Sequence, residues 1–517
     1  MKRSIHKLLL AALGASVLLG ACHKGVEDRT TTYPALAPKN IDLNADTWKP
    51  VLVKDFSTLN VPAPDATTSP AYVADINEIK GAQSHLTADQ QNIINYWSAG
   101  AVLRWNQILR DLVAKHNLPP YQNADGTYPA PSSTNPFAYP IFPFANPPYA
   151  ARAYAYVSAA QYDALVAAYH FKKQYNRVAP YTFDANVKAL IPKSALSSYP
   201  SEDAVVAGAT VEIMKLLFPA DIDYIEQKAQ EEMQYRIMAG ANVRGELTAG
   251  QLLGVQVADL FAARARTDKA GKAIGTPADW TQLQTKTAAK GETFWISQES
   301  PKRPPMLPLF GKVTPFLFDT LTVAALRPPA PYGTNSAEFK KEVAEVLSYS
   351  QNPTREHQAI VEFWADGVGT YTPTGHWNAI AADEFVKENY SEVRWARNFA
   401  LLNMAEMDAA IVCWDTKYFY FNQRPTQANP KIKTLTGLPN FPAYTSGHSN
   451  FSGAAATVLS YLLPDRGNKF NDLANQASLS RLYGAIHYRS DIEMGMTTGI
   501  KVGQYAVERA KNDGAGN

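Results

Sequence analysis

The sequence has few cysteines, little strand patterning and, after its first 22 residues, no long apolar run. Only Cys22 and Cys413 occur among 517 residues, which excludes a fold stapled by several disulfides. Without a later run of about 18 apolar residues, the body of the chain predicts no membrane-spanning helix. Lys and Arg number 49 against 47 Asp and Glu, and no basic stripe points to nucleic acid as a partner.

The first 22 residues have the pattern of an exported lipoprotein. The start is basic and carries no acid, and residues 8–21 form an apolar run too short to cross a bilayer. The run closes as Leu19-Gly20-Ala21-Cys22, which resembles the bacterial lipobox, where a signal peptidase cuts before a cysteine that is then lipidated. We therefore expect residues 1–21 to be a signal peptide and Cys22 to carry the anchor. The alternative is an ordinary signal peptide with an incidental cysteine.

The residue after the cysteine bears on the destination. His23 rather than aspartate follows Cys22, which in lipoproteins of Gram-negative bacteria favours the outer membrane. The resemblance to a lipobox therefore implies an exported protein that is lipid-anchored to the outer membrane, on its periplasmic or cell-surface face.

Helical patterning accounts for most of the remaining chain, and we predict an all-α protein with long Pro-rich loops. Residues 22–75 are polar and rich in Pro and Thr, which is typical of a tether followed by an irregular wrapping segment. Apolar residues at spacings of three to five indicate an N-terminal helical half over 76–335, irregular from about 267 onward. A C-terminal helical half over 336–512 and a frayed tail at 513–517 complete the chain.

Some helix boundaries follow from capping residues. Ser336 and Thr354 are expected N-caps of two helices in the C-terminal half. Residues 393–420 are predicted to be helical throughout, and a further helix is expected from Ser449 to Leu463. The sequence Ser490-Asp491-Ile492-Glu493 fits a capping box that opens the last helix.

Three short blocks in the C-terminal half carry residue types that suit one tetrahedral oxyanion. They are Lys417 with Arg424-Pro425 after six residues, Tyr444-Thr445-Ser446-Gly447-His448, and Ser480-Arg481 followed by His487 and Asp491. Three cations can neutralise several negative charges, and two of them are forked guanidinium donors. Ser446 and Gly447 precede a predicted helix, where unpaired amides and the helix dipole favour an anion. Two histidines beside such a ligand can divide the work of ligand or nucleophile and of general acid/base.

The blocks resemble the superfamily shared by vanadium-dependent haloperoxidases and type-2 phosphatidic acid phosphatases. Its pattern is Lys-x6-Arg-Pro, Pro-Ser-Gly-His and Ser-Arg-x5-His-x3-Asp, and the resemblance covers about residues 90–510. Trp414, the run that starts at Phe441, and Phe363-Trp364-Ala365-Asp366-Gly367 also look like haloperoxidase segments. We therefore identify the chain as similar to the haloperoxidase branch, in a bacterial lipoprotein form.

This resemblance implies a vanadate cofactor, with phosphate able to occupy the same site. His487 would be the ligand of the metal, and the vanadate oxygens would be held by Lys417, Arg424, Ser446, Gly447 and Arg481. His448 would be the acid/base toward hydrogen peroxide, and Lys417 would polarise the bound peroxide for attack by halide. The product is a hypohalous-acid equivalent that halogenates small organic acceptors. His448, His487 and Lys417 are thus the expected catalytic residues.

Four further residues are expected to surround this site. Asp491 would orient the imidazole of His487. Asp366 would pair with Arg481, although a capping or surface role is the alternative for both aspartates. Trp414 and Phe441 are the aromatic neighbours; chloroperoxidases tend to have Phe where Phe441 stands, and algal bromoperoxidases have His.

The chain departs from the family pattern in two places. Thr445 replaces the usual Pro before Ser446, and Gln423 stands where haloperoxidases often have Trp. Two other residues are expected to be bystanders, namely His376 as a histidine packed in a loop rather than in the pocket, and Cys413 as a buried, inert thiol.

Two other functions stay open from the sequence. The same site would serve an acid phosphatase in which His487 attacks phosphorus and His448 protonates the leaving group. A non-catalytic, glycan-binding surface lipoprotein is the third hypothesis, and it does not require the motif residues to cluster. No oligomeric state and no halide preference follow from the sequence.

Overall fold

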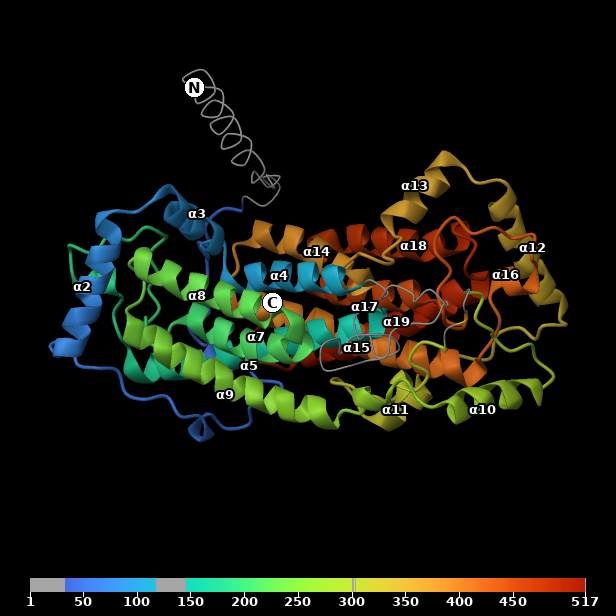
Figure 1. Ribbon diagram of the computed structural model, residues 1–517, viewed down its shortest axis with the longest axis horizontal. Coiled ribbons are helices and arrows are strands. Elements are labelled where there is room, and N and C mark those ends of the chain that lie inside the picture. Colours follow the sequence, from blue (N-terminus) through green and yellow to red (C-terminus); the bar gives the residue numbers. More distant parts are fainter. Residues whose placement is uncertain (1–32, 118–145, 300–301, 303, 517) are drawn as a thin grey trace, which may run out of the picture. The chain divides into compact units, whose positions relative to one another are not determined.

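The computed structural model describes residues 33–117, 146–299, 302 and 304–516, and nearly all its regular structure is helical (Figure 1). Within these ranges, strand pairing is limited to one isolated bridge between Phe294 and Asn422. The prediction of an all-α protein is therefore confirmed. None of the helices in the described ranges has the length and apolar character needed to cross a membrane.

The helices follow one another with short 3-10 turns between them. In chain order they are α2 (Pro70–Ser84), α3 (Ala88–Trp97), α4 (Ala101–His116), α5 (Pro147–Tyr175), α6 (Pro180–Phe183), α7 (Glu202–Leu217), α8 (Ile222–Met238), α9 (Arg244–Thr267), α10 (Pro277–Ala288), α11 (Thr320–Ala325), α12 (Ala337–Gln351), α13 (Arg355–Phe363), α14 (Thr372–Phe385), α15 (Glu392–Tyr420), α16 (Pro425–Ala428), α17 (Gly447–Leu462), α18 (Gly467–Tyr483) and α19 (Arg489–Lys511).

Two 29-residue helices, α5 and α15, form the centre of the fold and pack against each other. Both are buried along most of their length, and both are rich in alanine. Small side chains let helix backbones approach closely. A helix with apolar residues on every side is surrounded by other helices in the core. Within this core, the Nδ2 atom of Asn403 on α15 donates to the hydroxyl of Ser158 on α5 at 3.3 Å.

Helices α17 and α19 lie side by side and contact each other extensively (Figure 1). Glycine makes this approach possible, because a Cβ added at Gly499 of α19 would lie 2.2 Å from the carbonyl oxygen of Asn450 on α17. The two helices therefore bring their N-terminal ends together. The backbone amide of Ser446, just before α17, donates to the carbonyl of Asp491 in the first turn of α19 at 2.9 Å.

Two buried aspartates on the central helices hold irregular segments in place. The carboxylate of Asp163 on α5 accepts the amides of three consecutive residues, Val51, Leu52 and Val53, at 2.5 to 3.0 Å. Asp408 on α15 accepts the amides of Phe316 and Leu317 in the same way. Backbone donors of irregular segments need such partners once water is excluded. The wrapping segment expected before residue 75 is thus fixed by hydrogen bonds to the core.

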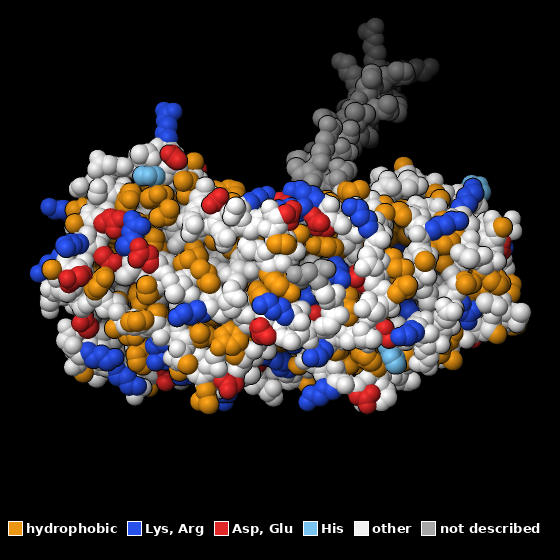
Figure 2. Space-filling model, turned by 180° about the vertical axis from the view of Figure 1, so that it is seen from behind, with side chains coloured by type: hydrophobic (Ala, Val, Ile, Leu, Met, Phe, Trp, Pro, Cys, Tyr) orange, Lys and Arg blue, Asp and Glu red, His pale blue; other side chains and the backbone are white. Residues whose placement is uncertain are grey.

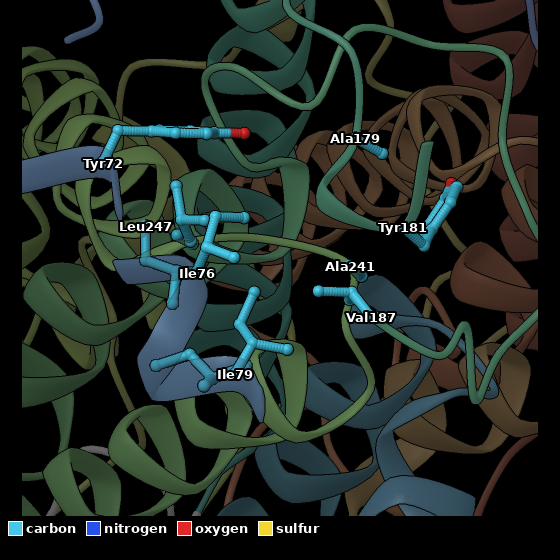
Figure 3. Packing of buried hydrophobic residues seen from close by; sticks show 11 residues of the cluster. Tyr72, Ile76, Ile79, Ala179, Tyr181, Val187, Ala241 and Leu247 are labelled. Atoms are coloured by element: carbon cyan, nitrogen blue, oxygen red, sulfur yellow. The ribbon is translucent and has the colours of Figure 1, made fainter. Parts of the chain in front are cut away.

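At the other end of the N-terminal region, α2 packs onto α8 and α9. Tyr72, Ile76 and Ile79 of α2 are buried against residues from four other segments (Figure 3). The rest of the cluster comprises Ala179, Tyr181, Val187, Ala204, Ile237, Ala241, Val243 and Leu247. On the molecular face that Figure 2 displays, Lys and Arg side chains are interspersed with Asp and Glu.

The helix starts predicted from caps are mostly confirmed, with one correction. The Ser336 hydroxyl accepts the amide of Phe339 at 3.1 Å, and Thr354 caps α13 in the same way. The last helix, however, begins at Arg489 with Tyr488 as its N-cap, and not at Ser490. The carboxylate of Asp491 accepts the Tyr488 amide at 2.9 Å, so aspartate in the third position already satisfies this helix start.

The expectation of an irregular stretch from about 267 to 335 is wrong in part. It contains α10, a 12-residue helix with Pro277 at its first position. The Thr276 hydroxyl accepts the amide of Asp279, and the Asp279 carboxylate accepts the amide of Thr276. This reciprocal cap explains why the segment becomes helical despite its polar sequence.

Several predictions lie outside the described residues. These are the signal peptide, the lipid anchor at Cys22, His23 and, among the expected Pro-rich loops, residues 118–145. The described residues from Ala35 onward form one compact unit, and the expected boundary near residue 335 between two helical halves stays a prediction.

Candidate active site

Lys417 lies near the end of α15 and is completely buried. Its ammonium donates to the carbonyl oxygens of Pro442 at 2.8 Å and Ala443 at 2.9 Å. The pKa of Lys417 is lowered to about 7, chiefly by burial and also by the positive charge of Arg424, while Cys413 and Asp491 oppose the shift. The two carbonyl groups hold the ammonium at a fixed place.

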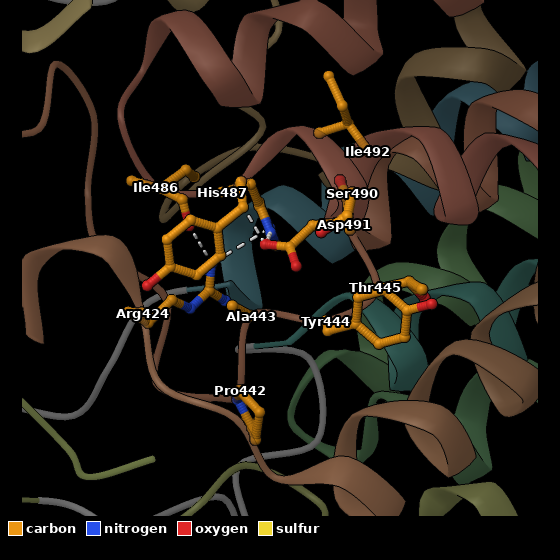
Figure 4. A network of polar contacts seen from close by, with 12 residues as sticks. Arg424, Pro442, Ala443, Tyr444, Thr445, Ile486, His487, Ser490, Asp491 and Ile492 are labelled. Carbon is orange, nitrogen blue, oxygen red and sulfur yellow. Dashed lines mark hydrogen bonds and ion pairs between the residues drawn. The ribbon is translucent and has the colours of Figure 1, made fainter. Parts of the chain in front are cut away.

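Arg424 comes from the turn that opens α16 and is also buried. Its Nε donates to the carbonyl of Phe441 at 2.9 Å, and its Nη1 donates to the carbonyl of Ile486 at 2.7 Å (Figure 4). The Nη1 atom also lies 3.1 Å from Nε2 of His487. Among the described residues, its Nη2 has no hydrogen-bond partner. Because burying an unpaired donor is costly, this free nitrogen indicates a missing acceptor.

His487 precedes α19 and is held by a carboxylate. Its Nδ1 lies 2.9 Å from Oδ2 of Asp491 (Figure 4). Burial lowers the pKa of His487 well below its usual value, and the charges of Arg424, Lys417 and Arg481 add to this effect. The ring is therefore neutral, with its proton on Nδ1 toward Asp491 and its lone pair on Nε2. The predicted role of Asp491 in orienting this ring matches the geometry.

Ser446 and Gly447 start α17, so this helix begins two residues before the start expected at Ser449. The Ser446 hydroxyl accepts the amide of Ser449 at 3.3 Å, which makes Ser446 the N-cap. The nearest atoms to a Cβ built on Gly447 belong to Trp414 and Phe451, each 3.8 Å away. A Cβ at residue 447 would therefore make ordinary van der Waals contacts and no clash. The N-terminus of α17 carries the partial positive charge of its first amides.

His448 is half-buried, and its Nε2 lies 3.3 Å from Oδ2 of Asp366. The pKa of His448 is lowered to about 4, chiefly by burial and then by the charge of Arg481, while Asp366 opposes the shift. The pKa of Asp366 would be raised by burial alone, but the hydrogen bond with His376 and the close contact with His448 bring it well below its usual range. Asp366 is thus an ionised acceptor beside a neutral imidazole.

The expected pairing of Asp366 with Arg481 is replaced by another arrangement. Nη2 of Arg481 donates to the carbonyl of Trp364 at 2.6 Å, and its Nε donates to the Ser480 hydroxyl at 2.9 Å. Asp366 is engaged by two histidines instead, because the loop turns its carboxylate toward α14 and α17. Arg481 stays in the site, since its charge acts on both His448 and His487.

Aromatic rings form the wall beside the two cations. Trp414 and Phe441 have ring centroids 5.0 Å apart, and the Lys417 ammonium lies 4.9 Å from the Phe441 centroid. The indole N–H of Trp414 donates to the carbonyl of Met306, which anchors this wall to the preceding irregular segment. Cys413 is fully buried near Thr445, as expected, and burial raises the pKa of its thiol.

The donor set suits an oxyanion rather than a bare metal cation. Lys417, Arg424 and Arg481 bring three cations around the neutral imidazole of His487, and the amide end of α17 faces the same region. Among the described residues no group of three or more His, Cys, Asp or Glu side chains could ligate a metal ion. The unpaired Nη2 of Arg424 and the lack of a side chain at Gly447 are what a tetrahedral anion such as vanadate or phosphate would use.

All the predicted site residues of the C-terminal half therefore converge. This clustering is what the two enzyme hypotheses required and what the glycan-binding hypothesis did not. His376, which was expected to be packed in a loop outside the pocket, instead lies on α14, and its Nδ1 lies 2.9 Å from Oδ1 of Asp366. A signal was present, because Thr372-Pro373 starts a helix soon after Asp366 and sets His376 in its second turn.

Comparison with known proteins agrees with this geometry. The sequence profile of the PAP2 superfamily matches residues 399–512, which include all three motif blocks. The C-terminal part of the chain is a PAP2 superfamily domain. No curated protein gives a significant match to the chain.

Two solved structures resemble this chain over a longer stretch than residues 399–512. A structure described as the first bacterial vanadium-dependent iodoperoxidase shares 26% identity with a TM-score of 0.55, over 70% of this chain and 91% of that one. A bacterial vanadium-dependent chloroperoxidase in its holo form shares 14% identity with a TM-score of 0.51, over 72% of this chain and 93% of that one. The likeness therefore extends well beyond the PAP2 domain into the N-terminal helices.

Proposed function

We propose that this protein oxidises halide with hydrogen peroxide, using vanadate bound among the three motif blocks. The observation that carries the proposal is the neutral His487, whose Nδ1 is bound by Asp491 and whose Nε2 lies among three cations. The similarity of the chain at 26% identity to a bacterial iodoperoxidase supports the peroxidase reaction over others of the superfamily. Hydrogen peroxide, halide and one proton would give hypohalous acid and water, and the hypohalous acid would halogenate small organic acceptors.

Each residue has a role in this proposal. When bound, vanadate would supply a Lewis-acidic centre that makes hydrogen peroxide electrophilic toward halide. Nε2 of His487 would be the protein ligand, and Arg424, Arg481, Lys417, Ser446 and the amide of Gly447 would hold the oxygens. Lys417 would donate a hydrogen bond as negative charge develops on the departing oxygen.

His448 would take the proton from incoming hydrogen peroxide. A base must be neutral to accept a proton, and the lowered pKa of His448, about 4, keeps its ring neutral near pH 7. Asp366 would then stabilise the imidazolium that forms, through the 3.3 Å contact with Nε2. His448 is half-buried, so peroxide would meet it at the edge of the site.

Phosphate-ester hydrolysis is the second candidate, and the PAP2 match favours it. The same neutral Nε2 of His487 would attack phosphorus, the ester oxygen would leave with a proton from His448 in its imidazolium form, and water would then release phosphate from His487. Phosphoryl transfer places charge on three equatorial oxygens, and these would meet the same cations that would hold the oxygens of vanadate.

One experiment separates the two functions. The purified full chain is assayed with vanadate, hydrogen peroxide and iodide, bromide or chloride in turn, beside hydrolysis of a generic phosphate ester without vanadate. We expect vanadate-dependent halide oxidation, with iodide tested first because the 26% identical structure is an iodoperoxidase. Hydrolysis of the ester alone would select the phosphatase, and His487→Ala is the inactive control for both.

We further propose that the protein is exported and lipid-anchored through Cys22 to the outer membrane. The support is the lipobox-like sequence alone. Detergent partitioning of wild type and Cys22→Ser, together with mass spectrometry of the N-terminal peptide, tests this. A cleaved but unlipidated wild-type chain would favour an ordinary signal peptide.

A further inference from the structure

A second histidine lies behind the acid/base histidine, joined to it by one carboxylate. Oδ1 of Asp366 lies 2.9 Å from Nδ1 of His376, and Oδ2 lies 3.3 Å from Nε2 of His448. Because Asp366 is ionised, it can only accept, so each histidine must turn an N–H toward it. His376 therefore carries its proton on Nδ1, and His448 carries its proton on Nε2.

The two contacts differ in quality. The contact between His376 and Asp366 is a well-formed hydrogen bond. The contact between Asp366 and His448 is within ion-pair distance, but neither Oδ2 nor Nε2 has an aligned hydrogen-bond partner. Catalytic hydrogen bonds are often long without a ligand and tighten when it binds. The fixed end of this array is thus His376, and the adjustable end is His448.

The loop that carries Asp366 is held tightly in position. The side-chain amide of Asn117 donates to the carbonyls of Gly367 at 2.9 Å and Thr370 at 3.0 Å. The backbone carbonyl of Asn117 accepts the Gly369 amide at 2.7 Å. Asp366 has φ of 45°, a left-handed conformation that most residues avoid. Such conformations persist only where the surroundings impose them, and they cluster at functional sites.

His376 is packed between rings. Its ring centroid lies 4.5 Å from that of Trp364 and 4.8 Å from that of Phe363, with Tyr371 at 6.1 Å. The residue is 7% exposed. The carbonyl of Trp364 is also the acceptor of Arg481 Nη2. The same loop therefore connects His376 to the site on both sides, through Asp366 and through Trp364.

We propose that His376 is a positioning residue that acts on His448 through Asp366. By donating to Oδ1, it fixes the rotation of the carboxylate, so that Oδ2 holds His448 with its proton on Nε2 and its lone pair on Nδ1. Nδ1 is then the atom that accepts a proton from the incoming co-substrate. Without His376, the carboxylate of Asp366 can rotate, and His448 loses its single orientation and tautomer. This role rests on the proposed function, in which His448 is the acid/base.

The groups that face the array are few. Asp366 faces both histidines. The charge of Arg481 lowers the pKa of His448, and Asp366 raises the pKa of Arg481. Protonation of His448 would disfavour protonation of His487. Tyr371 faces His376 with its ring, and its hydroxyl is raised in pKa by burial, so it stays neutral.

The test compares two substitutions at position 376. His376→Phe keeps an aromatic ring against Trp364 and Phe363 but removes the donor. His376→Asn places an amide N–H where Nδ1 stands and keeps the hydrogen bond to Asp366. His357→Phe is the matched control, because His357 stacks on Tyr483 at 4.0 Å and has no contact with Asp366 among the described residues.

Two readouts are taken on the full chain. The first is the tautomer of His448, from the nitrogen chemical shifts of 15N-histidine-labelled protein without vanadate, assigned by comparison with His448→Gln. The second is kcat for the reaction that the wild type catalyses. We expect His376→Phe to lose the single Nε2–H tautomer and to reduce kcat by about tenfold to a hundredfold. We expect His376→Asn to restore both, and His357→Phe to leave both unchanged.

The outcomes are separable from those of the proposed function. Absence of halide oxidation in the wild type would overturn that function, yet the tautomer comparison would still decide the role of His376. A single Nε2–H tautomer and a wild-type kcat in His376→Phe would overturn the inference. So would a His376→Asn protein that is folded by circular dichroism but behaves like His376→Phe.

Discussion

Oδ2 of Asp491 lies 2.9 Å from Nδ1 of His487 and also accepts the backbone amide of Tyr488 at 2.9 Å. One carboxylate oxygen thus starts α19 and orients the histidine that precedes it. Burial raises the pKa of Asp491 to about 7, with the nearby Glu342 adding to the shift, while the Tyr488 amide and the cations Lys417 and Arg424 oppose it. The position of His487 is therefore coupled to the way the last helix begins.

We expect His487→Ala to abolish halide oxidation and to weaken vanadate binding while the fold is retained. The reason is that Nε2 of His487 is the proposed ligand, whereas its ring is a small part of a large helical core. Asp491→Asn should be milder, with a loss of about tenfold to a hundredfold in vanadate affinity, because only the orientation of the ring is affected. Vanadate titration by calorimetry and circular dichroism check this. A His487→Ala protein with wild-type vanadate affinity would exclude the ligand role.

We expect anion binding to be accompanied by proton uptake at Lys417 above pH 7. Burial lowers the pKa of this ammonium to about 7, so in the free protein it is mostly neutral at pH 8.5. A bound anion favours the charged form and raises the pKa, so a proton enters with the anion; below pH 7 the group is already charged and the uptake vanishes. Calorimetry with inorganic phosphate in two buffers of different ionisation enthalpy measures the uptake. Equal uptake in Lys417→Met would assign it elsewhere.

We expect Gly447→Ala to weaken oxyanion binding without loss of stability. A Cβ at this position would make only ordinary van der Waals contacts with the protein, at 3.8 Å from Trp414 and Phe451, so the fold can accommodate it, whereas an anion bound against Gly447 would meet it. A steric penalty of about 1–3 kcal/mol would weaken binding by roughly one to two orders of magnitude. Gly499→Ala is the contrasting variant, because its Cβ would lie 2.2 Å from the carbonyl oxygen of Asn450 and should lower the melting temperature. Equal phosphate affinity in Gly447→Ala and wild type would argue against the anion lying there.

We expect Asp163→Asn to destabilise the fold and to expose the wrapping segment. The carboxylate holds the amides of Val51, Leu52 and Val53, and an asparagine oxygen cannot accept all three. Hydrogen bonds to charged groups contribute about 1.5–3 kcal/mol each at most, so a loss of roughly 2–3 kcal/mol in the free energy of unfolding is expected. Urea denaturation measures the loss, and limited proteolysis near residue 51 detects the release. Cleavage that is no faster than in wild type would mean that other contacts hold the segment.

Much of the fold follows from local sequence. The predicted range 393–420 became α15 (Glu392–Tyr420), and the cap at Ser336 formed as expected, because capping and long apolar periodicity act within a few residues. The start of α19 was misplaced by two residues from the capping sequence. The helix start depends on the carboxylate of Asp491, which accepts the Tyr488 amide and also contacts His487. A capping pattern in the sequence does not reveal that one carboxylate has both contacts.

The residues of the candidate site could be predicted from the sequence, but their contacts could not. Residue type and spacing alone gave Lys417, Arg424, Ser446, Gly447, His448, Arg481 and His487, since an oxyanion needs cations, amides and imidazoles in any fold. What each side chain contacts was decided by tertiary packing. Arg481 is bound by the Trp364 carbonyl, and Asp366 by His376 and His448, because a loop held by Asn117 places them there. Contacts between segments a hundred residues apart depend on how helices pack, and no short-range pattern encodes them.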